Sequence, residues 1–76
     1  MQDHDWSDLR CFLALHRAGT LSGAGRRIGV SETTVARRLK RLERALGAPL
    51  FLRDAQGRAA ITDAGQRILG PAEAAE

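Results

Sequence analysis

The sequence predicts a small, mainly α-helical domain with a three-helix core, a short two-stranded wing and the start of a further helix. Apolar residues recur at helical spacing as far as residue 46, and short extended runs replace them from residue 50 onward. Serine, threonine and glycine stand where helices should begin and end. Seventy-six residues suit one domain near the lower size limit for a single apolar core.

The first helix is expected to run from about residue 6 to Ala18. Asp5 or Ser7 can cap its beginning, Asp8 lies in its first turn, and Gly19 can end it. Because apolar residues line one broad face, this helix is predicted to be amphipathic. That face comprises Trp6, Leu9, Phe12, Leu13 and His16.

Residues 21–46 are predicted to form a helix-turn-helix. Gly25 supplies a small residue where two helices approach, Gly29 tolerates the positive φ of a tight turn, and Val35 faces inward. Thr20 or Ser22 caps the first helix of the pair, and Ser31 caps the second, which Gly47 ends. The predicted core stripe of the second helix is Val35, Leu39, Leu42 and Leu46, with Ala24, Ile28 and Val30 packed against it.

A hairpin and a last helix are predicted after Pro49. Residues 50–52 and 59–61 are extended candidates, and residues 54–57 have turn chemistry, so the hairpin would be the wing of a winged helix-turn-helix. Thr62 caps a helix that begins at Asp63 and meets Pro71.

Positive charge is concentrated in the middle of the chain. Residues 26–58 carry nine basic and three acidic side chains, whereas the segments before and after them are slightly acidic. Such asymmetry, rich in arginine, is typical of a protein that binds a polyanion. A solvated helix face would explain the charge alone equally well. Since the second helix of a helix-turn-helix can enter the major groove, we expect double-stranded DNA as the partner.

The chain resembles the N-terminal DNA-binding domain of LysR-type transcriptional regulators, from about Trp6 to Pro71. The resemblance is carried by residues 9–12, 19–22, 30–35 and 50–53, together with Arg37, Leu42-Glu43, Leu46-Gly47 and Ile61-Thr62-Asp63-Ala64-Gly65. It implies a winged helix-turn-helix over residues 1–62, and the start of a linker helix over residues 63–76 that pairs two subunits through Ile68 and Leu69. In the family a small-molecule effector is sensed by a further C-terminal domain, so the chain is expected to be a fragment of a longer regulator or a free-standing domain.

The recognition helix is expected at about residues 32–46, in the major groove, in a homodimer on an inverted repeat. Arg37 is predicted to contact a base edge, because arginine pairs bidentately with guanine. Arg38 and Arg41 are predicted to bind phosphate, so that Arg41→Ala should weaken binding to all sequences alike. The predicted DNA-binding residues are Ser31, Glu32, Thr33, Thr34, Arg37, Arg38, Arg41, Arg26, Arg27, Arg53 and Arg58.

Two of these residues, and the neighbouring cations Lys40 and Arg44, have structural alternatives. Ser31 also caps the helix, Arg53 can bridge to an acidic residue, and Lys40 and Arg44 can pair with Glu43 or Asp54. The sequence also departs from the family at positions where glutamine, serine and alanine are common, which here are Glu32, Ala36 and Gly25. Glu32 can only accept hydrogen bonds, for instance from cytosine N4. The wing is about one residue longer than is usual, which affects the placement of Arg58.

Two other classes of function stay open on the sequence alone. The apolar stripe of residues 35–46 could be a coiled-coil seam, although it covers only about two heptads. An RNA-binding or architectural domain could use the same basic surface, although the few aromatic residues lie in apolar contexts. The histidines and the cysteine lack metal-ligand spacing and no catalytic constellation is present, so no metal, cofactor or enzymatic activity is expected. Without a membrane-spanning run or a signal peptide, the expected location is the cytoplasm, at the nucleoid.

Overall fold

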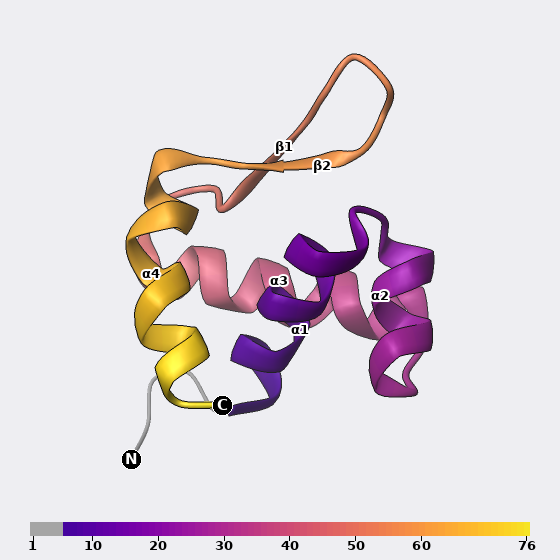
Figure 1. Cartoon of the computed structure of the whole chain (residues 1–76), viewed down its shortest axis with the longest axis horizontal. Coiled ribbons are helices and arrows are strands. Elements are labelled where there is room, and N and C mark those ends of the chain that lie inside the picture. Colours follow the sequence, from indigo (N-terminus) through magenta and orange to yellow (C-terminus); the bar gives the residue numbers. More distant parts are fainter. Residues whose placement is uncertain (1–5) are drawn as a thin grey trace.

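The computed structural model describes residues 6–76. Helices α1 (Trp6–Ala18), α2 (Leu21–Ile28) and α3 (Glu32–Leu46) precede strands β1 (Phe51–Arg53) and β2 (Ala59–Ile61) and helix α4 (Asp63–Ala74). The strands pair antiparallel, with Phe51 opposite Ile61 and Arg53 opposite Ala59. Figure 1 shows α3 extending between α2 and α4, with the hairpin projecting beyond the helices. The predicted winged helix-turn-helix is confirmed.

The helices begin where the sequence predicted, and α1, α2 and α3 also end there. The side chains of Thr20, Ser31 and Thr62 each accept a hydrogen bond from the backbone N–H three residues later, at 3.0–3.1 Å. The glycines that follow α1, α2 and α3 have φ between 75° and 81°, a conformation that other residues rarely adopt. Ser7 lies within α1, so its predicted capping role is wrong, and the alternative cap Asp5, like His4, lies outside the described residues.

The turn between α2 and α3 depends on Gly25. Its carbonyl accepts hydrogen bonds from the backbone N–H groups of Gly29 and Val30, at 2.8 and 3.0 Å. A Cβ atom at Gly25 would lie 2.5 Å from the carbonyl oxygen of Val30. Gly25, which was predicted to lie where the two helices approach, is therefore in contact with the turn between them.

The core joins α1 to α3 and to the wing. Phe12, Leu13, Val35, Leu42 and Leu50 are fully buried. The ring of Phe12 on α1 lies 5.5 Å from the ring of Phe51 on β1, centre to centre, which anchors the wing on the helical core.

Two predicted core positions are wrong. Leu46 is 39% exposed because it lies in the last turn of α3, just before Gly47 ends the helix. Trp6 is 40% exposed because the side of α1 that faces α3 carries Asp8, Cys11 and Leu15 instead. The central part of α1, residues 11–15, is buried all round, so no simple amphipathic stripe describes this helix.

Helix α4 continues through Pro71 to Ala74 rather than ending at the proline. Its beginning is held by Thr62, whose hydroxyl donates to the carbonyl of Pro49 at 2.7 Å and whose backbone N–H donates to the carbonyl of Leu50 at 3.0 Å. Over residues 6–76, none of the helices has the length and apolar character needed to cross a bilayer.

Candidate nucleic-acid interface

The outward side of α3 carries a stripe of exposed polar and cationic residues. Thr33, Arg37, Lys40 and Arg44 follow one another at spacings of four, three and four, which places them on the side of the helix opposite Val35. Within residues 6–76, their side chains form no hydrogen bond or ion pair. We call these four residues the outer stripe. Lys40 and Arg44 therefore do not pair with Glu43 or Asp54, the alternative that the sequence left open.

The first turn of α3 is arranged by Ser31. Its hydroxyl accepts the backbone N–H of Thr34 at 3.1 Å and donates to the Thr34 side-chain oxygen at 2.9 Å. These two hydroxyls thus contact each other, whereas Glu32 and Thr33 beside them are exposed. Glu32 lines the groove between α3 and the wing. The carboxylate at Glu32 also suits the partial positive charge of the helix N-terminus.

Arg41 has a partner inside the protein. Its guanidinium donates two hydrogen bonds to the carboxylate of Asp8, at 2.6 and 2.9 Å, and the Asp8 side chain is only 1% exposed. Since 52% of the Arg41 side chain remains exposed, the pair lies at the edge where α1 meets α3. A bidentate contact of this kind fixes the orientation of both side chains. It therefore ties the middle of α3 to the first turn of α1.

Arg38 lies on the same side of α3, one turn earlier. It lies close to the thiol of Cys11, which is fully buried in α1. Burial raises the pKa of Cys11, and the contact with Arg38 opposes that rise in part. Arg38 and Arg41 thus both contact α1, while the outer stripe lies on a different side of the helix.

Sequence reasoning missed Asp8, which it treated only as a favourable acid in a first helical turn. The signal was present in its spacing. Asp8 precedes the buried residues Cys11 and Leu15 by three and seven positions, so it occupies a core-facing position of α1. A carboxylate at such a position needs a cationic partner, because burying an unpaired charge is very costly.

The two arginines of α2 lie in different surroundings. Arg26 donates to the hydroxyl of Ser22, at 2.8 Å, one turn earlier on the same helix. Arg27 lines a pocket against α1, together with Arg10 and Arg17. The structure therefore does not bring Arg27 together with the outer stripe.

The wing arginines are held by backbone carbonyls. Arg53 donates to the carbonyl of Gly57 across the hairpin turn at 2.9 Å, so its predicted acidic partner is replaced by a carbonyl. Arg58 donates to the carbonyl of Ala18 at the end of α1 at 3.0 Å. Next to it, the backbone N–H of Ala59 donates to the carbonyl of Gly19 at 2.9 Å. These contacts hold the turn end of the wing against the segment between α1 and α2.

A groove of about 430 Å³ separates the wing from α3 and the start of α2. Thr20 and Ser22 line it at the beginning of α2, Lys40 and Glu43 from α3, and Arg53 from the wing. Leu52 also lines it and is 62% exposed on β1. The groove is lined by two cationic and two acidic side chains, because Glu32 and Glu43 lie beside Lys40 and Arg53. Only its cationic groups suit contact with phosphates.

The predicted dimerisation residues pack in part against the core of their own domain. Ile68 and Leu69 on α4 are half-buried and pack partly against the apolar core. Only part of each side chain is therefore available to a second subunit.

Comparison with known proteins gives consistent matches. The family described as bacterial regulatory helix-turn-helix proteins, lysR family, matches residues 6–66. The chain is 49% identical over 47 residues to the Mau operon transcriptional activator of Paracoccus denitrificans, covering 62% of this chain and 17% of that protein. It is 44% identical over 64 residues to the small neutral protease regulatory protein of Streptomyces coelicolor, covering 84% of this chain and 19% of that protein. The chain thus spans less than a fifth of the length of these relatives.

Solved structures show the same fold. The CbnR DNA-binding domain in complex with DNA superposes with a TM-score of 0.84 at 31% identity, covering 93% of this chain and 80% of that one. OxyR of Corynebacterium glutamicum superposes with a TM-score of 0.91 at 23% identity, covering 97% of this chain and 24% of that one, and this likeness concerns the fold alone.

Proposed function

Because the chain belongs to the lysR family of bacterial regulatory helix-turn-helix proteins, we propose that it reads a specific duplex sequence with α3. It is a DNA-binding domain of a transcriptional regulator rather than an enzyme. The observation that carries this proposal is the outer stripe. Thr33, Arg37, Lys40 and Arg44 present a polar and cationic surface that the rest of the described chain leaves unpaired. Unpaired cations on one helix face suit a helix that enters the major groove.

Within the outer stripe we assign different tasks to different residues. Arg37 lies in the second turn of α3, close to the end that approaches base edges, and its guanidinium can pair with guanine O6 and N7. Lys40 and Arg44 lie further along the helix and would contact phosphates. At the beginning of α3, Thr33 and Glu32 would contact bases, with Glu32 favouring a donor such as cytosine N4.

Arg38 and Arg41 receive a positioning role in this proposal. Their contacts with Cys11 and Asp8 hold α3 on α1, and thereby set the angle at which the outer stripe meets the groove. The exposed half of Arg41 leaves it able to contact a phosphate as well, as the sequence suggested. Mutation of Arg41 would then weaken DNA binding partly through the fold.

Flanking phosphates would be bound by three further arginines, of which Arg53 lines the groove between α3 and the wing. Arg26, Arg53 and Arg58 are exposed, and each is oriented by one hydrogen bond to the protein. An arginine held in this way still has N–H groups to donate, because a guanidinium carries five. Arg27 is left out of this set because it lies in the pocket against α1.

We further propose a cytoplasmic homodimer on an inverted repeat, paired through an extended linker helix that begins with α4. The longest dimension of the domain is 36 Å. One turn of DNA measures about 34–36 Å, so two domains related by a two-fold axis can occupy successive major grooves on one side of the duplex. Any small-molecule effector would bind a C-terminal domain like that of the longer family members.

Selection of bound sequences from a random duplex library tests the proposal. We expect enrichment of a symmetric, interrupted repeat, with guanine at a position read by Arg37. Arg37→Ala should remove the preference at that position, at a cost of about 1–3 kcal/mol on the selected sequence and little on random DNA.

Arg44→Ala should weaken binding to selected and random duplexes equally, and should reduce the slope of log K against log salt by about one. The matched control is Arg67→Ala, which removes an exposed arginine on α4 that forms no ion pair within residues 6–76. If the library yields no preferred sequence, or if Arg37→Ala and Arg44→Ala have the same effect on every duplex, α3 does not read bases as proposed.

A further inference from the structure

A second pocket, of about 260 Å³, lies on α1 between the ends of α2 and α4. Its accessible apolar surface comes from half-buried Ile28 of α2 and from Trp6, which is 40% exposed, whereas Leu13 of α1 is buried beneath them. Three arginines surround this apolar centre, Arg10 and Arg17 from α1 and Arg27 from α2. An apolar centre with an aromatic residue and several arginines is typical of a protein-binding surface.

The pocket faces away from the recognition helix. Trp6, Arg10 and Arg17 lie on one side of α1, at spacings of four and seven residues. Asp8, which contacts Arg41 of α3, is offset from Trp6 and from Arg10 by two residues, and two residues correspond to a rotation of about 200° around a helix. A duplex held by α3 would therefore leave this pocket accessible.

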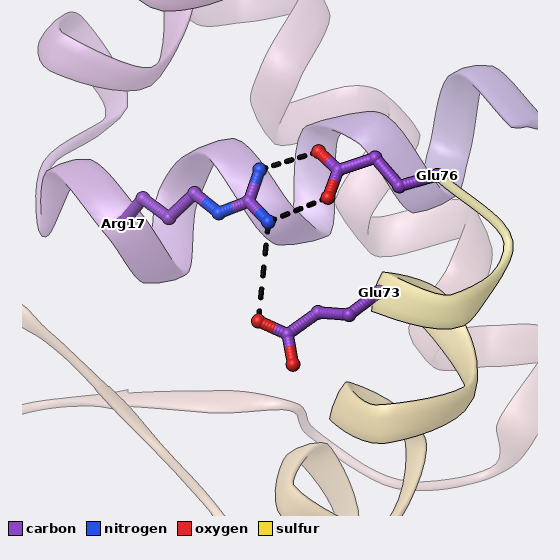
Figure 2. A network of polar contacts seen from close by, with 3 residues as sticks. All are labelled: Arg17, Glu73 and Glu76. Carbon is purple, nitrogen blue, oxygen red and sulfur yellow. Dashed lines mark hydrogen bonds and ion pairs between the residues drawn. The ribbon is translucent and has the colours of Figure 1, made fainter.

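A carboxylate already occupies part of the pocket. Figure 2 shows the guanidinium of Arg17 facing the carboxylates of Glu76 and Glu73 at the end of the chain. Arg17 donates two hydrogen bonds to Glu76, at 2.6 and 2.7 Å, and its guanidinium lies 3.9 Å from Glu73. The contact with Arg17 lowers the pKa of Glu76, and nearby Arg27 lowers it further. The site thus favours a carboxylate in its charged form.

The three arginines around the pocket carry more positive charge than the two glutamates neutralise. Arg10 and Arg27 form no hydrogen bond or ion pair with any residue from 6 to 76. Within residues 6–76, two guanidinium groups near Trp6 thus have N–H groups to donate to an anionic ligand, and the exposed ring of Trp6 suits an apolar side chain better than a phosphodiester.

We propose that this pocket is a docking surface for an acidic segment of a partner protein, which Glu76 imitates. One carboxylate of the partner would take the place of Glu76 at Arg17. Further carboxylates would approach Arg10 and Arg27, and an apolar side chain would contact Trp6 and Ile28. The surface would let the domain hold a protein while α3 is on DNA.

The sole tryptophan of the chain, Trp6, provides the readout. The probe is a capped synthetic peptide with the sequence of residues 71–76, which carries both glutamates, and its matched control has glutamine at both positions. The protein variant Glu76→Gln removes the carboxylate that is hydrogen-bonded to Arg17 and leaves only that of Glu73, at 3.9 Å. Titration of this variant with the glutamate peptide should change the tryptophan fluorescence. The peptide should bind the variant more tightly than it binds the unaltered chain.

Adding Arg17→Ala to Glu76→Gln should weaken peptide binding by about tenfold, because a bidentate charge-assisted contact is lost. Arg44→Ala, on the far side of the molecule, should leave peptide binding unchanged. Circular dichroism of each variant separates loss of the pocket from loss of the fold.

Three results would overturn the proposal. Equal binding of the glutamine peptide would show that no carboxylate is recognised, and an unchanged affinity in the Arg17 variant would show that binding occurs elsewhere. If Arg10→Ala and Arg27→Ala weaken duplex binding as much as Arg44→Ala does, these arginines bind phosphate instead. Because the peptide titration contains no DNA, its outcome is independent of the proposed duplex recognition.

Discussion

The contact between Asp8 and Arg41 should contribute strongly to stability, and its two members should contribute unequally. Removing one partner of a buried ion pair typically costs about 3–5 kcal/mol. The Asp8 side chain is 1% exposed, but 52% of the Arg41 side chain is exposed to water. Because the pair is only half-buried, the loss of stability should be smaller than for a fully buried pair. We therefore expect Arg41→Ala to lower the free energy of unfolding by about 2–3 kcal/mol, a large fraction of the stability of a domain this small.

The asymmetry follows from burial. Arg41→Ala removes the guanidinium from a carboxylate that water does not reach, whereas Asp8→Ala leaves an arginine that can turn to solvent. The double variant should therefore be more stable than Arg41→Ala alone, or at least as stable. The two substitutions should be non-additive by about 1–3 kcal/mol, as is usual for residues in direct contact.

Urea denaturation followed by far-UV circular dichroism measures these differences. Arg44→Ala is the matched control, because it removes another exposed arginine of α3 that forms no ion pair within residues 6–76, and it should change stability by less than about 0.5 kcal/mol. If Arg41→Ala is no more destabilising than this control, or if the two substitutions are additive, the contact does not hold α3 on α1. The same measurement shows whether a loss of DNA binding in Arg41→Ala arises from unfolding.

Three further predictions concern α4. Gly65→Ala should destabilise by about 1–2 kcal/mol despite the better helix propensity of alanine, since its Cβ would lie 2.7 Å from the carbonyl of Leu50; Gly70→Ala, whose Cβ would have no neighbour within 4 Å, should be neutral or stabilising in the same thermal melts. Thr62→Ala should cost about 1–2 kcal/mol in urea denaturation, because one hydroxyl caps α4 and also donates to a carbonyl of the preceding segment, and a smaller loss than that of an ordinary cap would contradict this double role. The pKa of Glu76 is lowered in the folded chain, so Glu76 should keep its contact with Arg17 above pH 4.5, its ordinary pKa, and lose this contact only as the pH falls below that value. If a change in tryptophan fluorescence at acidic pH persists in Glu76→Gln, the change arises from another group.

The sequence predicted the helices and their ends closely, because these depend on neighbouring residues. A hydroxyl needs only the N–H groups of the next turn to cap a helix, and a glycine ends one through its own backbone. The same locality made the side of Arg37 predictable, since its spacing from Val35 determines the side of α3 on which it lies. Lys40 and Arg44 share that side but were not among the predicted DNA-binding residues. The fold class and the family likewise follow from residues read in order.

Tertiary structure alone decided what each charged side chain contacts. Asp8 and Arg41 are far apart in the sequence, and only the packing of α1 on α3 brings the buried carboxylate to the guanidinium. Packing likewise placed Arg27 in a pocket with Arg17, away from the outer stripe, and left Trp6 exposed. The reason is physical: helical periodicity gives the side of a helix on which a residue lies, but the charge or apolar surface that meets this side belongs to another segment.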